Sequence, residues 1–165
     1  MTSPPPTRPR VYLETTVLSY LTALPFRDIL RAAHQQITAD WWVGRDAFEL
    51  FVSDVVITEM RRGDVDAAAR RLDAAVGIPV LTTTPHAERL ASSLLSAAAL
   101  PSKAAIDALH VANAAVNGMH FLLTWNCAHI ANAAMRPRIE GVCRGEGYEP
   151  PIICTPEELQ TRVKP

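Results

Sequence analysis

The 165-residue chain lacks the motifs of several common enzyme classes. Its glycines, among them Gly44, Gly63 and Gly77, stand isolated, so there is no GxGxxG or Walker A phosphate loop. It also has no HExxH motif, no CxxC spacing and no GxSxG nucleophile elbow. Dinucleotide binding, P-loop chemistry, structural zinc and serine-hydrolase chemistry are therefore unsupported.

The chain also has few cysteines, no excess of basic charge and no long apolar run. Three cysteines, Cys127, Cys143 and Cys154, favour reduced thiols over a disulfide framework. A net charge of -1 disfavours a protein that coats nucleic acid, although an enzyme can handle nucleic acid through a local patch. No segment approaches the ~18 apolar residues of a membrane span, and the first ten residues have no apolar core of a secretory signal. We expect a cytoplasmic protein with no membrane partner.

The sequence contains enough apolar residues, 48%, for one globular domain. Residues 1–9 include four prolines and are expected to be a disordered lead-in to a single domain over residues 10–165. Short apolar segments predict strands at 10–14, 79–81, 120–124 and 151–154. Helical patterns separate these strands, which predicts an α/β domain with a largely parallel sheet under helical layers.

The helix pattern is interrupted by proline, glycine and capping residues. A long helix is expected to begin at Asp28 and to carry Trp41, Phe48 and Phe51 near one apolar face. Aromatic residues at this spacing are interpreted as core rather than as a stacking platform. The remaining helices are expected at 15–24, 55–62, 64–76, 85–100, 103–117 and 126–135, with a short one from Pro137 and a capping box at Thr155–Glu158.

Polar residues follow two of the expected strands. Glu14, Thr15 and Thr16 come after the first strand, and Thr124 and Asn126 come at the end of the strand near residue 121. Ligands of open parallel sheets bind beyond the carboxyl ends of the strands. These side chains are therefore expected to converge at one edge of the sheet.

The helix expected at 103–117 carries a polar stripe on an otherwise apolar surface. The stripe residues, which span an arc of about 120° at 100° per residue, are Lys103, Asp107, His110, Asn113 and Asn117. Such a helix is largely buried, so its polar stripe is expected to line a rim or a wet cleft. The alternative is a solvated face with a helix-internal Lys103–Asp107 pair.

Glu59 is the acidic residue of the short helix after Val52-Ser53, where its neighbours are mostly apolar. On its own it is better interpreted as an ordinary surface glutamate. His110 lies one helical turn after Asp107, but a role for it as a ligand or base is the less favoured interpretation, because most such histidines are structural.

Taken together, four segments resemble the PIN-domain nucleases, in particular the VapC-like toxins of type II toxin–antitoxin modules. Each segment is weak evidence alone, but all four occur in the family's order. They are Val11-Tyr-Leu-Glu-Thr-Thr-Val-Leu-Ser-Tyr-Leu, Val52-Ser-Asp-Val-Val-Ile-Thr-Glu-Met, Ala104-Ala-Ile-Asp-Ala-Leu-His-Val-Ala and Leu122-Leu-Thr-Trp-Asn-Cys-Ala-His-Ile.

The resemblance implies a three-layer α/β/α sandwich whose acidic pocket binds Mg²⁺ or Mn²⁺. It places Glu14, Glu59 and Asp107 as metal ligands, and Asn126 at the fourth position, holding a metal-bound water. The family most often has Asp at the first and fourth positions. Because Asn126 is neutral, a second metal is expected to bind more weakly than the first.

The resemblance also assigns supporting residues. Thr15, Thr16 and Thr124 match hydroxyl positions beside the metal. Cations expected to contact substrate phosphates are Lys103, Arg61, Arg62 and Arg10.

The function implied is metal-dependent hydrolysis of RNA phosphodiester bonds by a VapC-like toxin. The implied partners are an RNA substrate, a small inhibitory antitoxin and a second copy of the chain. The leading alternative is a PIN-fold binding or assembly module with little or no nuclease activity. A hydrolase of small phosphorylated molecules is less well supported, because Thr-Thr-Val follows Glu14 and supplies no second Asp for an aspartyl-phosphate route.

Overall fold

The computed structural model describes residues 7–160, so most of the expected lead-in, residues 1–6, lies outside the described residues. Within the described range a five-stranded sheet has the order β3-β2-β1-β4-β5, and every neighbouring pair is parallel. The strands are β1 (Arg10–Leu13), β2 (Glu49–Ser53), β3 (Val80–Leu81), β4 (Phe121–Leu123) and β5 (Ile152–Cys154).

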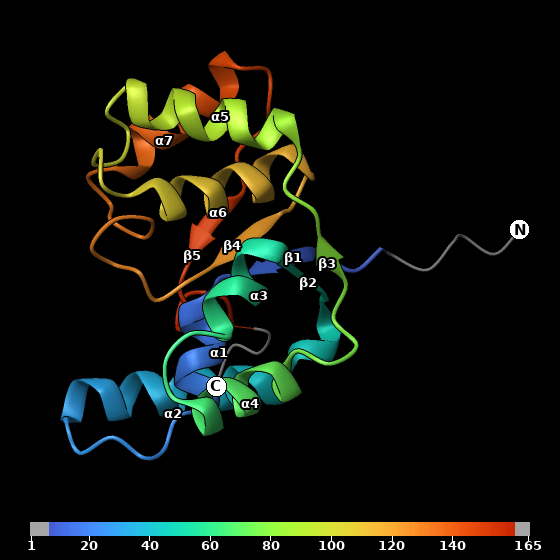
Figure 1. Ribbon diagram of the computed structural model, residues 1–165, viewed down its shortest axis with the longest axis vertical. Coiled ribbons are helices and arrows are strands. Elements are labelled where there is room, and N and C mark those ends of the chain that lie inside the picture. Colours follow the sequence, from blue (N-terminus) through green and yellow to red (C-terminus); the bar gives the residue numbers. More distant parts are fainter. Residues whose placement is uncertain (1–6, 161–165) are drawn as a thin grey trace, which may run out of the picture.

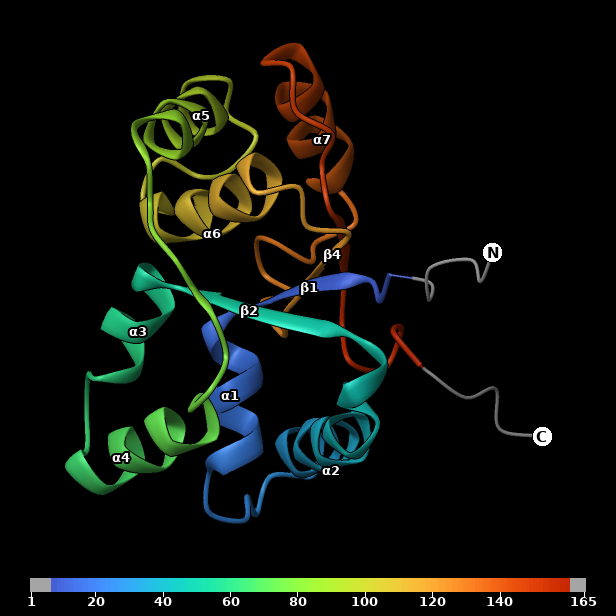
Figure 2. The same cartoon turned by 90° about the vertical axis from the view of Figure 1, so that its right-hand side faces the viewer.

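Helices cover both faces of the sheet, as Figures 1 and 2 show. The helices α1, α2 and α4 lie on one face, α5, α6 and α7 lie on the other, and α3 follows the end of β2. Their bounds are α1 (Thr15–Thr22), α2 (Ile29–Val43), α3 (Asp54–Met60), α4 (Val65–Ala74), α5 (Pro85–Ser96), α6 (Ala105–Val116) and α7 (Arg136–Gly145). The predicted α/β/α sandwich is confirmed.

The centre of the core is β1, which is covered by helices on both faces. Val11, Tyr12 and Leu13 are consecutive and all fully buried, as are Leu122 and Leu123 of neighbouring β4. Continuous burial, instead of alternation, is the pattern of a central strand in a parallel sheet. It explains why these strands appear in the sequence as short apolar runs.

Most helix ends occur where capping residues predicted them. The side chains of Asp28, Asp64 and Thr84 each accept a hydrogen bond from a backbone N–H in the first turn of α2, α4 and α5. After α6 the chain turns at Gly118, whose φ of 63° is a left-handed conformation that glycine adopts without a steric cost.

The long helix expected from Asp28 is shorter than predicted. Helix α2 ends at Val43, and Phe51 belongs to β2. The apolar spacing continued past the helix because Trp41 and Phe48 enter the same core, where they are stacked and only 3% and 8% exposed. Their prediction as core residues is confirmed.

The prediction of a helix at 126–135 is wrong, because this segment forms a series of turns before α7. The side-chain oxygen of Asn126 does accept the expected capping hydrogen bond, from the backbone N–H of His129 at 3.1 Å. At the other end of the chain, Thr155 and Glu158 exchange the two reciprocal bonds of a capping box.

Among the described residues, no helix combines the length and the hydropathy needed to cross a lipid bilayer. All three cysteines are free thiols, as predicted. Burial raises the pKa of Cys143 to about 11 and that of Cys154 to about 12, so both stay protonated at neutral pH.

Candidate metal centre

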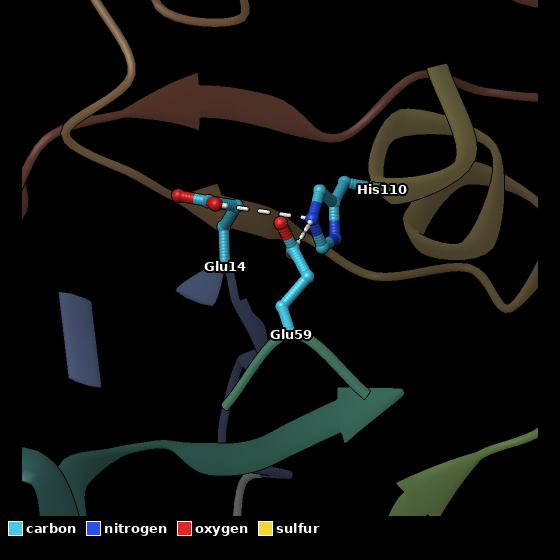
Figure 3. Close-up of side chains that lie close together, drawn as sticks. All are labelled: Glu14, Glu59 and His110. Carbon is cyan, nitrogen blue, oxygen red and sulfur yellow. Dashed lines mark hydrogen bonds and ion pairs between the residues drawn. The ribbon is translucent and has the colours of Figure 1, made fainter. Parts of the chain in front are cut away.

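Three elements bring two carboxylates and an imidazole together at the carboxyl edge of the sheet. Glu14 follows β1, Glu59 lies in α3, and His110 lies in the middle of α6. One ligand atom from each side chain lies within 4.8 Å of the others. Figure 3 shows the three side chains pointing toward one another from these separate elements.

Glu14 is a buried carboxylate whose two oxygens have different surroundings. It is only 3% exposed, and its Oε2 accepts hydrogen bonds from the Thr16 backbone N–H, the Thr16 hydroxyl and the Thr124 hydroxyl. No hydrogen-bond donor within residues 7–160 reaches Oε1, which lies 3.8 Å from Nε2 of His110. One oxygen is therefore fixed by the protein, and the other faces the cluster.

Glu59 is held by two partners. Its Oε1 accepts a hydrogen bond from the Thr15 hydroxyl at 2.6 Å and lies 2.6 Å from Nε2 of His110. Burial alone would raise the pKa of Glu59. The hydrogen bond to His110 and the positive charge of that ring outweigh burial, so the pKa is lowered and Glu59 is ionised at neutral pH.

His110 is the buried centre of the cluster. Burial alone would lower its pKa, but the hydrogen bond to Glu59 and the charges of Glu14 and Glu59 raise it. Its other ring nitrogen, Nδ1, lies 2.8 Å from the hydroxyl of Tyr12, which lies 2.7 Å from the hydroxyl of Ser53. Burial raises the pKa of Tyr12 far above its usual value, so this phenol is neutral.

Asp107, expected as the third acid, lies outside this cluster of three. Its Oδ2 lies 2.7 Å from Nδ1 of His129, which comes from the turns after β4. The alternative pair with Lys103 does not form within the described residues, since Lys103 precedes α6 and is exposed. A direct metal contact by Asp107 remains a prediction.

Thr124 and Asn126 connect the cluster that contains His110 to the pair formed by Asp107 and His129. The Thr124 hydroxyl donates to Glu14 at 2.8 Å and accepts from the Asn126 backbone N–H at 2.9 Å. The Asn126 side chain in turn accepts from the backbone of His129. Asn126 therefore fixes the loop that carries His129, and its predicted role in holding a metal-bound water stays a prediction.

Two hollows lie beside the cluster. The charged side chains lining the first, about 350 Å³, are Asp54, Glu59, Glu88 and Arg62. The second, about 320 Å³, is lined by Thr16, Tyr20, Phe26, Arg31 and Arg71 among others. Of the cations expected to contact phosphate, Arg62 thus lies at a hollow. Arg61 and Lys103 are exposed on the surface, and Arg10 bonds the carbonyl of Asn117 at the opposite edge.

The sequence analysis did not single out Arg31, Arg71 or His129, and it treated a ligand role for His110 as the less favoured interpretation. A signal existed for His110, which lies on the polar stripe one turn after Asp107. For the arginines no sequence signal existed, because they come from separate helices and meet only at the second hollow.

The residues of the cluster fit a divalent cation. Two carboxylate oxygens and an imidazole nitrogen are metal ligands, and the inward-facing Oε1 of Glu14 has no competing donor within residues 7–160. Glu14, Glu59 and His110 would hold such an ion, with the open sides of the cluster left for water or substrate.

No family model and no curated protein matches the sequence of this chain. Its fold, in contrast, is that of the VapC toxins, the PIN-like α/β fold that the sequence resemblance predicted. Mycobacterium tuberculosis VapC20, a toxin that cleaves the sarcin–ricin loop, superposes with a TM-score of 0.53 at 19% identity over 68% of this chain and 86% of that chain. A chain of Rickettsia felis VapBC2, solved bound to a DNA fragment from its promoter, superposes with a TM-score of 0.52 at 11% identity over 88% of this chain and 98% of that chain.

Proposed function

We propose that this protein is a divalent-metal-dependent ribonuclease of the VapC type. The observation that carries the proposal is the convergence of Glu14, Glu59 and His110 at the carboxyl edge of the parallel sheet. Ligand sites of open parallel sheets occur at this edge. The fold shared with VapC20, a toxin that cleaves the sarcin–ricin loop, supports the same reaction class.

The chain's own residues prepare the site for phosphodiester hydrolysis. Three donors orient Glu14, and the Thr15 hydroxyl orients Glu59, so both carboxylates are positioned before substrate arrives. A bound Mg²⁺ or Mn²⁺ would polarise the phosphoryl oxygen and lower the pKa of a water molecule. Asp107 lies one helical turn before His110 on α6 and pairs with His129 from the turns after β4, and this pair would orient water or phosphate.

The lining of the second hollow supports RNA as the substrate class. Thr16 lies in the second hollow and also bonds Glu14, so that hollow adjoins the metal centre. Arg31 and Arg71 supply positive charge there, and Tyr20 and Phe26 supply aromatic surface. Cations beside aromatic rings suit single-stranded RNA, because the cations contact its phosphates and its bases stack on the rings.

The proposal is tested by incubating purified protein with labelled RNA in Mg²⁺, in Mn²⁺ or in EDTA. Cleavage should require the metal and should fall by at least about 100-fold in Glu59→Gln, the loss typical of removing one preorganised electrostatic group from an active site. Glu149→Gln is the matched control, because Glu149 is 80% exposed and pairs with Arg144 on the surface. Cleavage that persists in EDTA, or that survives Glu59→Gln, would contradict the proposal.

The same assay tests Asp107. If it contacts the metal or its water, Asp107→Ala should remove cleavage. If Asp107 only positions His129, Asp107→Ala and His129→Ala should lower cleavage to the same extent.

The alternative function is a PIN-fold binding module with little nuclease activity. The neutral Asn126 and the net charge of -1 favour it. Metal binding without cleavage of any RNA would support this module. As a VapC-type protein, the chain would also be inhibited by a small antitoxin partner and would form a homodimer, which co-purification and the solution mass test.

A further inference from the structure

We propose that His110, and not Asp107, is the third protein ligand of the metal, and that the resulting mixed site selects Mn²⁺ over Mg²⁺. The inference rests on the metal centre proposed above, although it does not depend on RNA cleavage. It concerns two side chains on one face of α6, which the sequence alone could not separate.

The first argument is the geometry of the two candidates. Nε2 of His110 lies 2.6 Å from Glu59 and 3.8 Å from Glu14, so this nitrogen is between the two carboxylates. Asp107 is instead engaged by His129 at 2.7 Å. Three ligand atoms are therefore already gathered without Asp107.

The second argument is the hydrogen bonding of the far side of the imidazole. Metal-binding histidines usually donate their other ring N–H to a partner that fixes the tautomer and the ring orientation. Here Nδ1 can donate to the oxygen of Tyr12, which donates to Ser53, and all three groups are fully buried. In metal-free protein Nε2 carries the proton that bonds Glu59, and a metal would displace that proton and take the Nε2 lone pair, which faces the cluster.

The third argument is the chemistry of the donor set. Mg²⁺ dehydrates reluctantly and takes oxygen ligands, whereas Mn²⁺ shares the preference for carboxylates and, as a first-row transition metal, also accepts an imidazole nitrogen. A site with one nitrogen and two carboxylate oxygens therefore favours Mn²⁺ over Mg²⁺. A site built from Glu14, Glu59 and Asp107 would carry only oxygen and would lack this preference.

The test uses the full chain loaded with Mn²⁺ alone. Pulsed electron paramagnetic resonance detects the nuclear coupling of a nitrogen bonded to Mn²⁺, and calorimetry gives the Kd for Mn²⁺ and for Mg²⁺. We expect nitrogen coupling in the wild-type protein. His110→Gln, which places an amide near the position of Nε2, should abolish the coupling and reduce the preference for Mn²⁺ by at least about tenfold, the lower range for disturbing a metal-bound histidine.

His129→Gln is the matched control, because it also removes an imidazole that pairs with an acid of the same region. It should retain the coupling and the preference for Mn²⁺. Tyr12→Phe keeps both imidazoles and removes the hydroxyl that bonds Nδ1 and Ser53, so it should weaken Mn²⁺ binding about tenfold while coupling persists. This variant and the wild-type protein decide the question even if His110→Gln fails to fold.

Absence of Mn²⁺ binding, Mn²⁺ bound without nitrogen coupling, or coupling lost in His129→Gln would each overturn the inference. These outcomes are separate from the fate of the proposed function. RNA cleavage without nitrogen coupling leaves the ribonuclease standing and removes His110 as a ligand. Nitrogen coupling without cleavage of RNA keeps His110 as a metal ligand and contradicts the proposed ribonuclease function.

Discussion

At the scale of single residues, the metal centre is a connected chain of buried polar groups. Glu59 bonds His110, His110 bonds Tyr12, and Tyr12 bonds Ser53, so each group has its position fixed by the next. Buried polar groups are tolerated only when they are paired. The network therefore holds the imidazole in place before any ligand arrives.

In metal-free protein, the Glu59–His110 pair should make a contribution to the free energy of unfolding that is bell-shaped against pH. We expect this contribution to be lost in His110→Gln. The lowered pKa of Glu59 adds stability that is present above its unfolded value, 4.5, and is lost as the pH falls through the folded pKa. The raised pKa of His110 adds stability that is present below its unfolded value, 6.5, and is lost as the pH rises through the folded pKa. Both contributions are complete between these two unfolded values.

Urea unfolding in EDTA from pH 4 to pH 9 measures this difference between the wild-type protein and His110→Gln. We expect it to be largest near pH 5 to 6 and to shrink on either side. The control is His86→Gln, because His86 is exposed on α5 and lies outside the network. A difference that is independent of pH would show that the pair is not ionised in the folded protein.

The sequence resemblance named Glu14, Glu59 and Asp107 as the metal ligands, whereas the structure gathers Glu14 and Glu59 with His110. Glu14 follows a buried strand, and strand ends converge in parallel sheets. Asp107 and His110 lie on one helical stripe, and the stripe identifies the face but not which side chain enters the cluster. Asp107 is held outside the cluster by His129, which lies 22 residues further along the chain, in the turns after β4. The helical stripe carries no information about this long-range contact.

At the scale of elements, helix α3 is positioned by Asp54, its first residue, which directly follows β2. The Asp54 carboxylate accepts hydrogen bonds from the backbone N–H of Val55 and from the N–H and hydroxyl of Thr83, at 2.8, 2.9 and 2.6 Å. The Thr83 hydroxyl also accepts from Asn113 of α6 at 3.0 Å. This network joins α3, which carries Glu59, to α6, which carries His110.

Asp54→Ala should therefore destabilise the fold by about 1.5–3 kcal/mol, the usual cost of losing hydrogen bonds to a charged group. It should also weaken metal binding, because Glu59 and His110 lose their common support. Urea unfolding and calorimetry measure the two effects. Asp64→Ala, at the exposed cap of α4, should cost about 1 kcal/mol and leave metal binding unchanged; equal metal affinity in both variants would contradict this role.

Element positions were largely predictable, because strands are short apolar runs and helices begin at capping residues. The two errors have a physical cause. Phe48 and Phe51 continue the apolar spacing of α2 because a turn and a strand return them to the same core. The segment 126–135 begins with a capping hydrogen bond from Asn126, but this bond stabilises a turn that no helix follows.

At the scale of the whole molecule, charge is distributed unevenly although the net charge is only -1. Among the described residues, Arg31 and Arg71 are the only charged side chains in the lining of the second hollow, whereas acids outnumber Arg62 in the lining of the first. Such a local patch attracts a polyanion without a basic excess overall. Composition alone could not predict it.

The salt dependence of RNA binding tests this patch. With single-stranded RNA in EDTA, Arg31→Ala should reduce the slope of log Kobs against log salt by about 0.7, the value for one phosphate contact. Arg144→Ala is the control, because Arg144 is exposed on α7 and pairs with Glu140 and Glu149. An unchanged slope in Arg31→Ala, or an equal change in the control, would exclude the second hollow as a phosphate site.

The central claim is that Glu14, Glu59 and His110 together hold a divalent metal. Anomalous diffraction from crystals of this protein grown with Mn²⁺ tests it most directly, because the signal locates the ion independently of any activity. The account predicts one strong anomalous peak bounded by these three side chains. A peak bounded by Asp107 and lacking His110, or no peak in this pocket at saturating Mn²⁺, would contradict it.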